Sequence, residues 1–152
     1  LTLSLLSGRQ VIIKNIRASH SNPGMLEYEV NLLQLIEKVT NGCQMSINKT
    51  GTRLIFRPGI IDANDGQEVK HDCNLSRNIS YYLEVICMLG IFGKTELAVT
   101  LTGNTDDMQD QSVDSFTRSF NFMMEQCNSP TANIKVVKRG FAPLGGGLVT
   151  LR

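Results

Sequence analysis

The tripeptide His71-Asp72-Cys73 is the first place where residue types and spacing could support chemistry. A histidine can accept the proton of a cysteine, and the thiolate that results is a nucleophile. Because successive side chains of a strand point to opposite faces, His71 and Cys73 would share one side of a strand and Asp72 would not. Free cysteine is also often buried as a small apolar residue. We therefore favour a half-buried thiol at a strand end over a catalytic pair.

Basic residues and glycines gather near both ends of the chain. Residues 1–26 contain three Lys or Arg and residues 133–152 contain four, and neither segment contains a carboxylate. If the two segments lie side by side in one sheet, they would form a local anion site, whereas apart they would be ordinary solvated surface. Gly145-Gly146-Gly147 would let a backbone approach a phosphate. The predicted strand that follows and the missing Lys-Ser/Thr distinguish this run from a P-loop.

Metal binding is disfavoured by the spacing of the candidate ligands. No two of the four cysteines form a Cys-x-x-Cys pair, and neither histidine stands at zinc-finger spacing from a pair. The acidic run at residues 106–110 lacks the glycine and terminal glutamate of a calcium-binding EF-hand, and we expect it to cap a helix. The sequence therefore predicts free thiols, a reducing compartment and no metal.

With 152 residues, of which 41% are hydrophobic and 19% charged, the chain can bury a core without disulfides. A net charge of +1 excludes a globally basic histone-like protein and a strongly acidic one. No apolar run is long enough for a transmembrane helix, and no basic-then-apolar leader is visible. Because residues 1–6 look like an element already under way, with no Met before them, we expect the natural start to be missing.

Hydrophobic spacing predicts three long helices. Apolar residues recur every three or four positions over residues 25–40, over residues 79–89 and after Ser112. Ser112 or Asp110 would cap the last of these helices. The apolar face of that helix is expected to contain Val113, Phe116, Phe120, Met123, Met124 and Cys127.

Stretches rich in β-branched or alternating residues predict strands between the helices. They lie at residues 10–16, 44–48, 52–57, 68–72, 97–101, 134–137 and 148–151. Residues 1–7, closed by Gly8, would add the end of a helix, and residues 60–66 a polar loop. This order of elements predicts an α/β (α+β) fold with helices on one side of the sheets.

Four groups of short motifs, in register along the chain, resemble the RNA 3′-terminal phosphate cyclase superfamily. They are Ile16-Arg17-Ala18 with Asn22-Pro23-Gly24-Met25, Thr50-Gly51-Thr52 with Phe56-Arg57-Pro58-Gly59, Thr102-Gly103-Asn104-Thr105, and Arg139-Gly140-Phe141-x-Pro143-x-Gly145-Gly146-Gly147. The resemblance implies repeated βαβαββ units, with helices packed on one face of four-stranded sheets, and a small inserted domain.

Family chains are more than twice this length, so the resemblance implies that residues 1–152 are the N-terminal part of a cyclase-like domain. This part would be about one and a half repeats, with residues 1–66 as the first unit and residues 67–152 as the second. The glycine-rich nucleotide motif of the cyclases would precede Leu1, and their nucleotidylated histidine would follow Arg152.

Within the superfamily, the chain is more similar to the noncatalytic, cyclase-like branch. True cyclases carry Gln-His where this chain has Tyr28-Glu29, and a Gly/Ser-rich turn where it has residues 71–77. The cyclase-like branch has an acidic Tyr/Phe-Glu pair after Asn-Pro-Gly and a His-x-Cys turn. It also has the phrases Val39-Thr40-Asn41-Gly42 and Tyr81-Tyr82-Leu83-Glu84, and all of these are present here.

The resemblance implies a noncatalytic assembly factor in small-subunit pre-rRNA processing and ribosome biogenesis. The cyclase-like branch is associated with the nucleolus, with pre-rRNA and with a partner GTPase of ribosome assembly. Neither a cofactor nor a membrane is expected under this hypothesis, and no catalytic residue is assigned. The residues expected to contact RNA phosphates are Arg17, Arg57, Lys138, Arg139, Gly145, Gly146 and Gly147.

The alternative is an ATP-dependent RNA 3′-terminal phosphate cyclase. Such an enzyme converts an RNA 3′-phosphate to a 2′,3′-cyclic phosphate through enzyme and RNA adenylates, with ATP as its cofactor. Covalent AMP on the full-length protein would distinguish the enzyme from the assembly factor. Because the histidine region lies outside residues 1–152, we expect this piece alone to have no catalytic activity.

Overall fold

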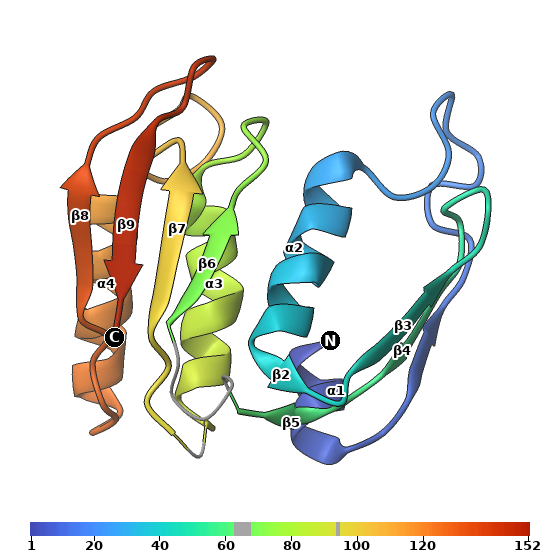
Figure 1. Cartoon of the computed structure of the whole chain (residues 1–152), viewed down its shortest axis with the longest axis horizontal. Coiled ribbons are helices and arrows are strands. Elements are labelled where there is room, and N and C mark those ends of the chain that lie inside the picture. The colour runs from blue at the N-terminus through green and yellow to red at the C-terminus, as the bar shows by residue number, and fades with distance from the viewer. Residues whose placement is uncertain (63–67, 94) are drawn as a thin grey trace.

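The first half of the chain builds a three-stranded antiparallel sheet against one long helix. The computed structural model describes residues 1–62, 68–93 and 95–152. Its first elements are α1 (Thr2–Ser7), β1 (Val11–Ile13), α2 (Glu27–Lys38), β2 (Thr40–Asn41), β3 (Gln44–Ile47), β4 (Leu54–Arg57) and β5 (Ile60–Ile61). The strand order is β1-β4-β3, and β2 pairs with β5 in a separate two-stranded ladder. Helix α2 covers one face of the three-stranded sheet (Figure 1).

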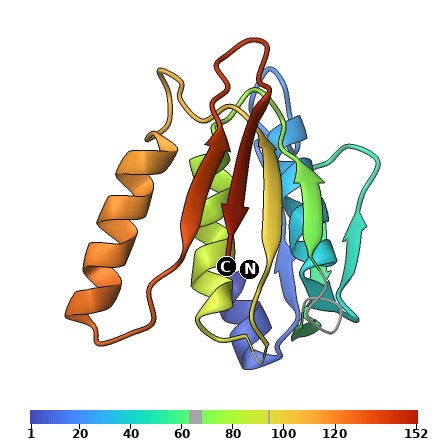
Figure 2. The same ribbon diagram turned by 60° about the vertical axis from the view of Figure 1, so that its left-hand side comes forward.

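The second half of the chain builds a four-stranded mixed sheet. Its elements are β6 (Val69–Asp72), α3 (Ile79–Gly90), β7 (Val99–Gly103), α4 (Val113–Gln126), β8 (Ile134–Lys138) and β9 (Gly147–Leu151). The order is β6-β7-β9-β8, with β6 and β7 parallel and the other pairs antiparallel. Helices α3 and α4 pack side by side against this sheet (Figure 2). The expected four-stranded sheet is therefore present here, and the first sheet has three strands among the described residues.

The core lies where the helices meet the two sheets. The apolar stripe of α3 is fully buried, because each of its five predicted members has an exposed fraction of 0%: Ile79, Tyr82, Leu83, Ile86 and Leu89. Helix α2 contributes Leu33, Leu35 and Ile36, and lies between the two sheets (Figure 1). Among the described residues, no helix has the length and apolarity needed to span a membrane.

The structure confirms most predicted elements and changes two of them. Strand β1 is shorter than residues 10–16, since Asn15 and Arg17 adopt positive φ angles of 59° and 45° and end the extended backbone. Ile60 and Ile61 pair with β2 and do not belong to a loop, whereas residues 63–67, with the predicted unit boundary, lie outside the described residues.

The apolar face of α4 is narrower than predicted. Val113, Phe120 and Met124 are buried, but Met123 is 52% exposed and Cys127, the C-cap residue, is exposed as well. The sheet covers only one side of this helix, so the flanking positions remain in solvent. The predicted N-cap is confirmed, because the Ser112 hydroxyl accepts a hydrogen bond from the Ser115 amide at 3.3 Å.

Candidate functional site

The two basic end segments lie in different sheets. Strand β1 belongs to the three-stranded sheet, whereas β8 and β9 belong to the four-stranded sheet, and the two sheets flank α2 (Figure 1). The condition for a single anion site, that the two segments lie side by side in one sheet, is therefore not met, and the alternative of two separate solvated surfaces holds. Local strand sequence does not determine which sheet a strand joins, and the sheets are separated by the strand pairing of each half.

Two of the predicted phosphate contacts, Arg17 and Arg139, are already engaged by carboxylates. Arg17 forms a two-pronged ion pair with Glu29 and donates from Nη1 to the Gly24 carbonyl at 2.9 Å. The hydrogen bonds that Arg17 donates to Glu29 raise the pKa of Arg17. Arg139 donates from Nη1 to Asp114 at 2.6 Å and to Asp106 at 3.4 Å. These bonds hold loops in place, and any role of the two arginines toward phosphate stays a prediction.

Arg57 and Lys138 are exposed, but they lie in different sheets. Arg57 donates from Nε to Gln10 at 3.1 Å and from Nη1 to Gln44 at 3.5 Å, so its neighbours are neutral. Lys138 ends β8, and no side-chain bond of Lys138 is present among the described residues. The structure therefore does not bring the four predicted cations together at one site.

The glycine run, residues 145–147, lies where several loops meet at the end of the four-stranded sheet. A Cβ on Gly147 would lie 2.7 Å from the Gly103 carbonyl oxygen and 2.8 Å from the Thr105 methyl carbon, so only glycine fits. A Cβ on Gly145 would lie 2.5 Å from the Leu75 side chain, whereas a Cβ on Gly146, which has a φ of 81°, would meet open space. Gly146 alone of the three therefore leaves room for a backbone to approach another molecule.

The Thr-Gly-Asn-Thr motif joins three loops at this junction. Asn104, fully buried, donates from Nδ2 to the Leu75 carbonyl at 2.7 Å and accepts at its own carbonyl from the Ile79 amide at 2.8 Å. The Thr105 amide donates to the Gly140 carbonyl at 2.8 Å. The third and fourth family motifs therefore form one structural unit with the start of α3.

The first two family motifs meet in the same way in the other half. Gly24 lies so close to the Thr50 carbonyl that no side chain fits, and the Met25 amide donates to the Gly51 carbonyl at 3.1 Å. The Ile16 amide donates to the Thr52 carbonyl at 3.0 Å. The four motifs thus form two loop junctions, one in each half of the chain.

His71 is buried and uncharged, and it takes part in a small hydrogen-bond network between β6 and α2. Its Nε2 lies 3.0 Å from Asn31 Oδ1 and its Nδ1 lies 3.3 Å from Lys38 Nζ, which assigns the proton to Nε2 and leaves Nδ1 as the acceptor. Burial and the nearby Lys38 charge lower the pKa of His71 to about 4. The imidazole therefore remains uncharged at neutral pH.

Cys73 shares the buried side of this strand with His71, and Asp72 is exposed, as strand alternation predicts. Burial, with the nearby Asp72 charge, raises the pKa of the Cys73 thiol far above its ordinary value. A thiol that stays protonated is a poor nucleophile. The structure therefore agrees with a structural cysteine, and all four cysteines of the chain are free.

A cluster of aromatic and charged side chains joins α2 to α3. The Arg77 guanidinium lies 4.1 Å from the ring centroid of Tyr81 and 5.0 Å from that of Tyr28, and the two rings pack edge to face. Arg77 also forms a two-pronged ion pair with Asp110 at 2.6 and 2.7 Å. Cation–π contacts and a bidentate carboxylate therefore fix this arginine between the two helices.

Asp110, the alternative to Ser112 as N-cap of α4, does not cap that helix and instead binds the start of α3. One of its carboxylate oxygens accepts from the backbone amide of Asn78, the N-cap residue of α3, at 3.0 Å. Arg77 was not singled out from the sequence, because its partner lies 33 positions away and such a pairing has no local signature. Tyr28, Tyr81 and His71, which belong to the branch-specific motifs, all lie in or beside this cluster.

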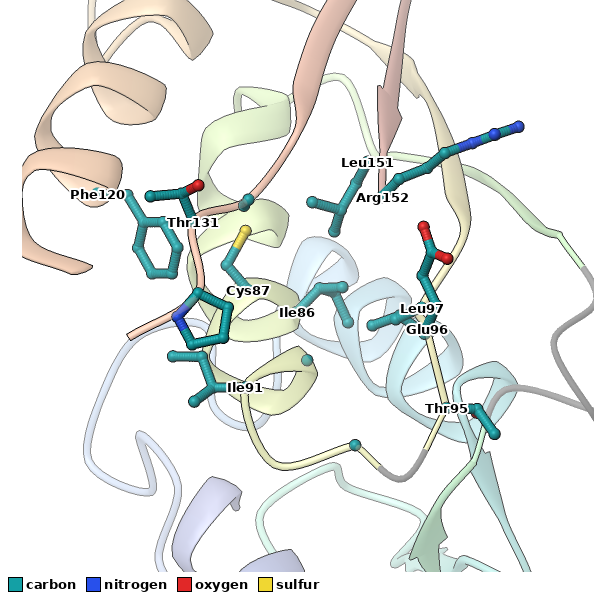
Figure 3. Close-up of a pocket in the computed structure, with 14 residues that line it drawn as sticks. Ile86, Cys87, Ile91, Thr95, Glu96, Leu97, Phe120, Thr131, Leu151 and Arg152 are labelled. Carbon is teal, nitrogen blue, oxygen red and sulfur yellow. The ribbon is translucent and has the colours of Figure 1, made fainter. Parts of the chain in front are cut away.

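A separate cavity of about 380 Å³ lies between α3, α4, the segment before β7 and the end of β9 (Figure 3). Its wall includes Ile86, Leu97 and Leu151, and Glu96 and Arg152 bring polar ends to one side. Burial raises the pKa of Cys87, which also lines the cavity, to about 12. None of the predicted phosphate contacts lines this cavity, whose apolar wall suits an apolar group.

The two sheets, their covering helices and the two glycine junctions define a mixed α/β protein with a partial cyclase fold. The family model described as RNA 3′-terminal phosphate cyclase matches residues 1–152. The chain therefore belongs to the RNA 3′-terminal phosphate cyclase family.

Known relatives are similar over nearly all of this chain. It is 44% identical to the probable RNA 3′-terminal phosphate cyclase-like protein of Arabidopsis thaliana, over 99% of this chain and 40% of that protein. It is 41% identical to the RNA 3′-terminal phosphate cyclase-like protein of Homo sapiens, over 98% of this chain and 40% of that protein. The rRNA processing protein rcl1 of Schizosaccharomyces pombe is 38% identical, over 98% of this chain and 41% of that protein. The chain thus spans about 40% of the length of these relatives.

Proposed function

We propose that this chain is part of a noncatalytic cyclase-like factor that acts in small-subunit pre-rRNA processing. Its relatives are named cyclase-like proteins, and one of them is named an rRNA processing protein. The proposal includes contact with pre-rRNA, binding of a ribosome-assembly GTPase and a nucleolar location. The last two rest on the resemblance to the cyclase-like branch.

The observation that carries this proposal is the structural use of Tyr28 and Glu29. The resemblance places the Gln-His pair of true cyclases at these positions. Here Glu29 binds Arg17 and accepts the Leu26 amide at 2.8 Å, which satisfies a free amide at the start of α2. Burial opposes the charge of Glu29, but the bonds from Arg17 and Leu26 prevail and lower its pKa.

Tyr28 also has a structural role, because its ring packs edge to face against Tyr81 and lies beneath the Arg77 guanidinium. Neither side chain is free to position a nucleotide or an RNA end. Both positions therefore support the fold, which favours an assembly factor over a cyclase.

The test is an adenylation assay on the full-length protein, with an authentic cyclase as the positive control. Incubation with α-labelled ATP and Mg²⁺, followed by denaturing electrophoresis, is expected to leave no label on the protein. An RNA with a 3′-phosphate is expected to remain uncyclised under the same conditions. Covalent AMP on the protein, or a 2′,3′-cyclic end on the RNA, would contradict the proposal.

A further inference from the structure

The three-stranded sheet has one uncovered face. Helix α2 lies against the other face, and no described helix packs on this one (Figure 1). We call it the outer face, and it consists of the side chains of Gln10, Ile12, Lys14, Gln44, Ser46, Arg53, Ile55 and Arg57. The alternation of β4 fixes this assignment, because Leu54 and Phe56 are buried while Arg53 and Arg57 are exposed.

The strand register arranges these side chains in rows across the sheet. Arg57 lies between Gln10 and Gln44, to which it donates hydrogen bonds. Ile55 pairs with Ile12, which is 44% exposed. Lys14 and Arg53 are the residues that adjoin the last pair of this ladder, Ile13 with Leu54, one on each strand. Two rows of cations and amides thus flank a short apolar row.

The sequence that builds this sheet contains no carboxylate. Residues 1–26 and 38–61 hold seven Lys or Arg and no Asp or Glu. The three acids among the first 61 residues, Glu27, Glu29 and Glu37, are all on α2, behind the opposite face. Lys14, Arg53 and Arg57 form no ion pair among the described residues. A chain of net charge +1 therefore concentrates uncompensated positive charge on one sheet face.

We infer that the outer face binds the phosphate backbone of RNA, independently of its base sequence. Cations without acidic partners attract phosphates, and the planar forks of Arg53 and Arg57 can each bind two phosphate oxygens. The inference rests on the proposed function, which brings an RNA to this protein. It differs from the expectation of contacts at Lys138, which ends β8 in the other sheet, and at Arg139, which follows it.

The composition of the face favours RNA over an acidic protein segment. Protein interfaces usually have a buried apolar centre rich in aromatic residues, whereas here two isoleucines lie between polar rows. The only aromatic residue of β4, Phe56, points into the core with an exposed fraction of 0%. Without an exposed ring the face cannot stack bases, so its contacts are expected to be with the backbone.

The test compares two double variants of the full chain that remove equal charge. Lys14→Gln with Arg53→Gln changes the outer face, and Arg118→Gln with Lys135→Gln changes exposed positions of the other half. Binding of fluorescent single-stranded RNAs, one of uridines and one of adenosines, is measured by anisotropy at salt concentrations from roughly 50 to 200 mM. Thermal melting verifies that each variant is folded, and Lys14→Arg with Arg53→Lys preserves the charge.

Loss of two phosphate contacts is expected to reduce the slope of log K against log salt by about 1.4, equally for both RNAs. The control pair and the charge-preserving pair are expected to retain the original slope. An unchanged slope in Lys14→Gln with Arg53→Gln, or an equal fall in the control pair, would overturn the inference.

A polyglutamate peptide separates RNA from an acidic protein partner. If this peptide, and not RNA, loses affinity in the outer-face pair, the face is a protein-docking surface and the inference is wrong. The adenylation assay is independent of this result. Covalent AMP would refute the proposed function without bearing on the outer face. An unchanged salt slope would refute RNA binding by the outer face without bearing on the proposed function.

Discussion

At the scale of single residues, the burial of His71 makes the free energy of unfolding depend on pH. Its lowered pKa means that the unfolded chain binds a proton between pH 6.5 and about 4 that the folded chain does not. Stability therefore rises with pH across this window and is lost as the pH falls through it. The shift corresponds to at most about 3 kcal/mol.

We expect the free energy of unfolding to fall by up to this amount as the pH is lowered from 6.5, and His71→Gln to remove most of the dependence. Urea unfolding at a series of pH values measures it. The carboxyls with lowered pKa lose their stabilisation below their ordinary pKa values, 4.5 for Glu29 and 3.8 for Asp110 and Asp114, so the range from pH 6.5 to 4.5 reports on His71. His20→Gln, at an exposed loop position, is the matched control. A pH dependence that survives in His71→Gln would contradict the assignment.

At the scale of elements, the glycine junction depends on how closely backbones approach. A Cβ on Gly140 would collide with the Gly147 amide and lie 2.5 Å from the Gly145 carbonyl oxygen, with no flexible side chain to move aside. We expect Gly140→Ala to lower stability by about 3 kcal/mol or more. Gly146→Ala meets only its left-handed φ, at a cost of about 1 kcal/mol. Thermal or urea unfolding of the two variants distinguishes these costs, and equal losses would show that crowding is not the cause.

Elements with local signatures were predictable from the sequence, and contacts between distant segments were not. The stripe of α3 recurs at helical spacing, and all five residues are fully buried. The ion pair of Arg77 with Asp110 has no such period, because a loop residue reaches across 33 positions. The outer face also required the strand order, since β1 and β4 are far apart in sequence and pair only in the folded chain.

At the scale of the whole molecule, the side-chain amide of Asn31 forms hydrogen bonds that link the first half of the chain to the second. Asn31 on α2 accepts from the Asn74 amide at 3.1 Å and donates to the Asp72 carbonyl at 3.1 Å, in addition to its contact with His71. We expect Asn31→Ala to cost about 2 kcal/mol and to speed hydrogen exchange at the Asn74 amide. Gln34→Ala, at an exposed position of the same helix, should change little. If the two variants behave alike in unfolding and exchange, the bridge contributes nothing.

The double commitment of Glu29, to Arg17 and to the first turn of α2, makes this position costly to change. A histidine there would strip the arginine of its counterion and leave the Leu26 amide without its acceptor. Because the two contacts share one carboxylate, Glu29→His would need compensating substitutions at both partners before the start of α2 regained its stability.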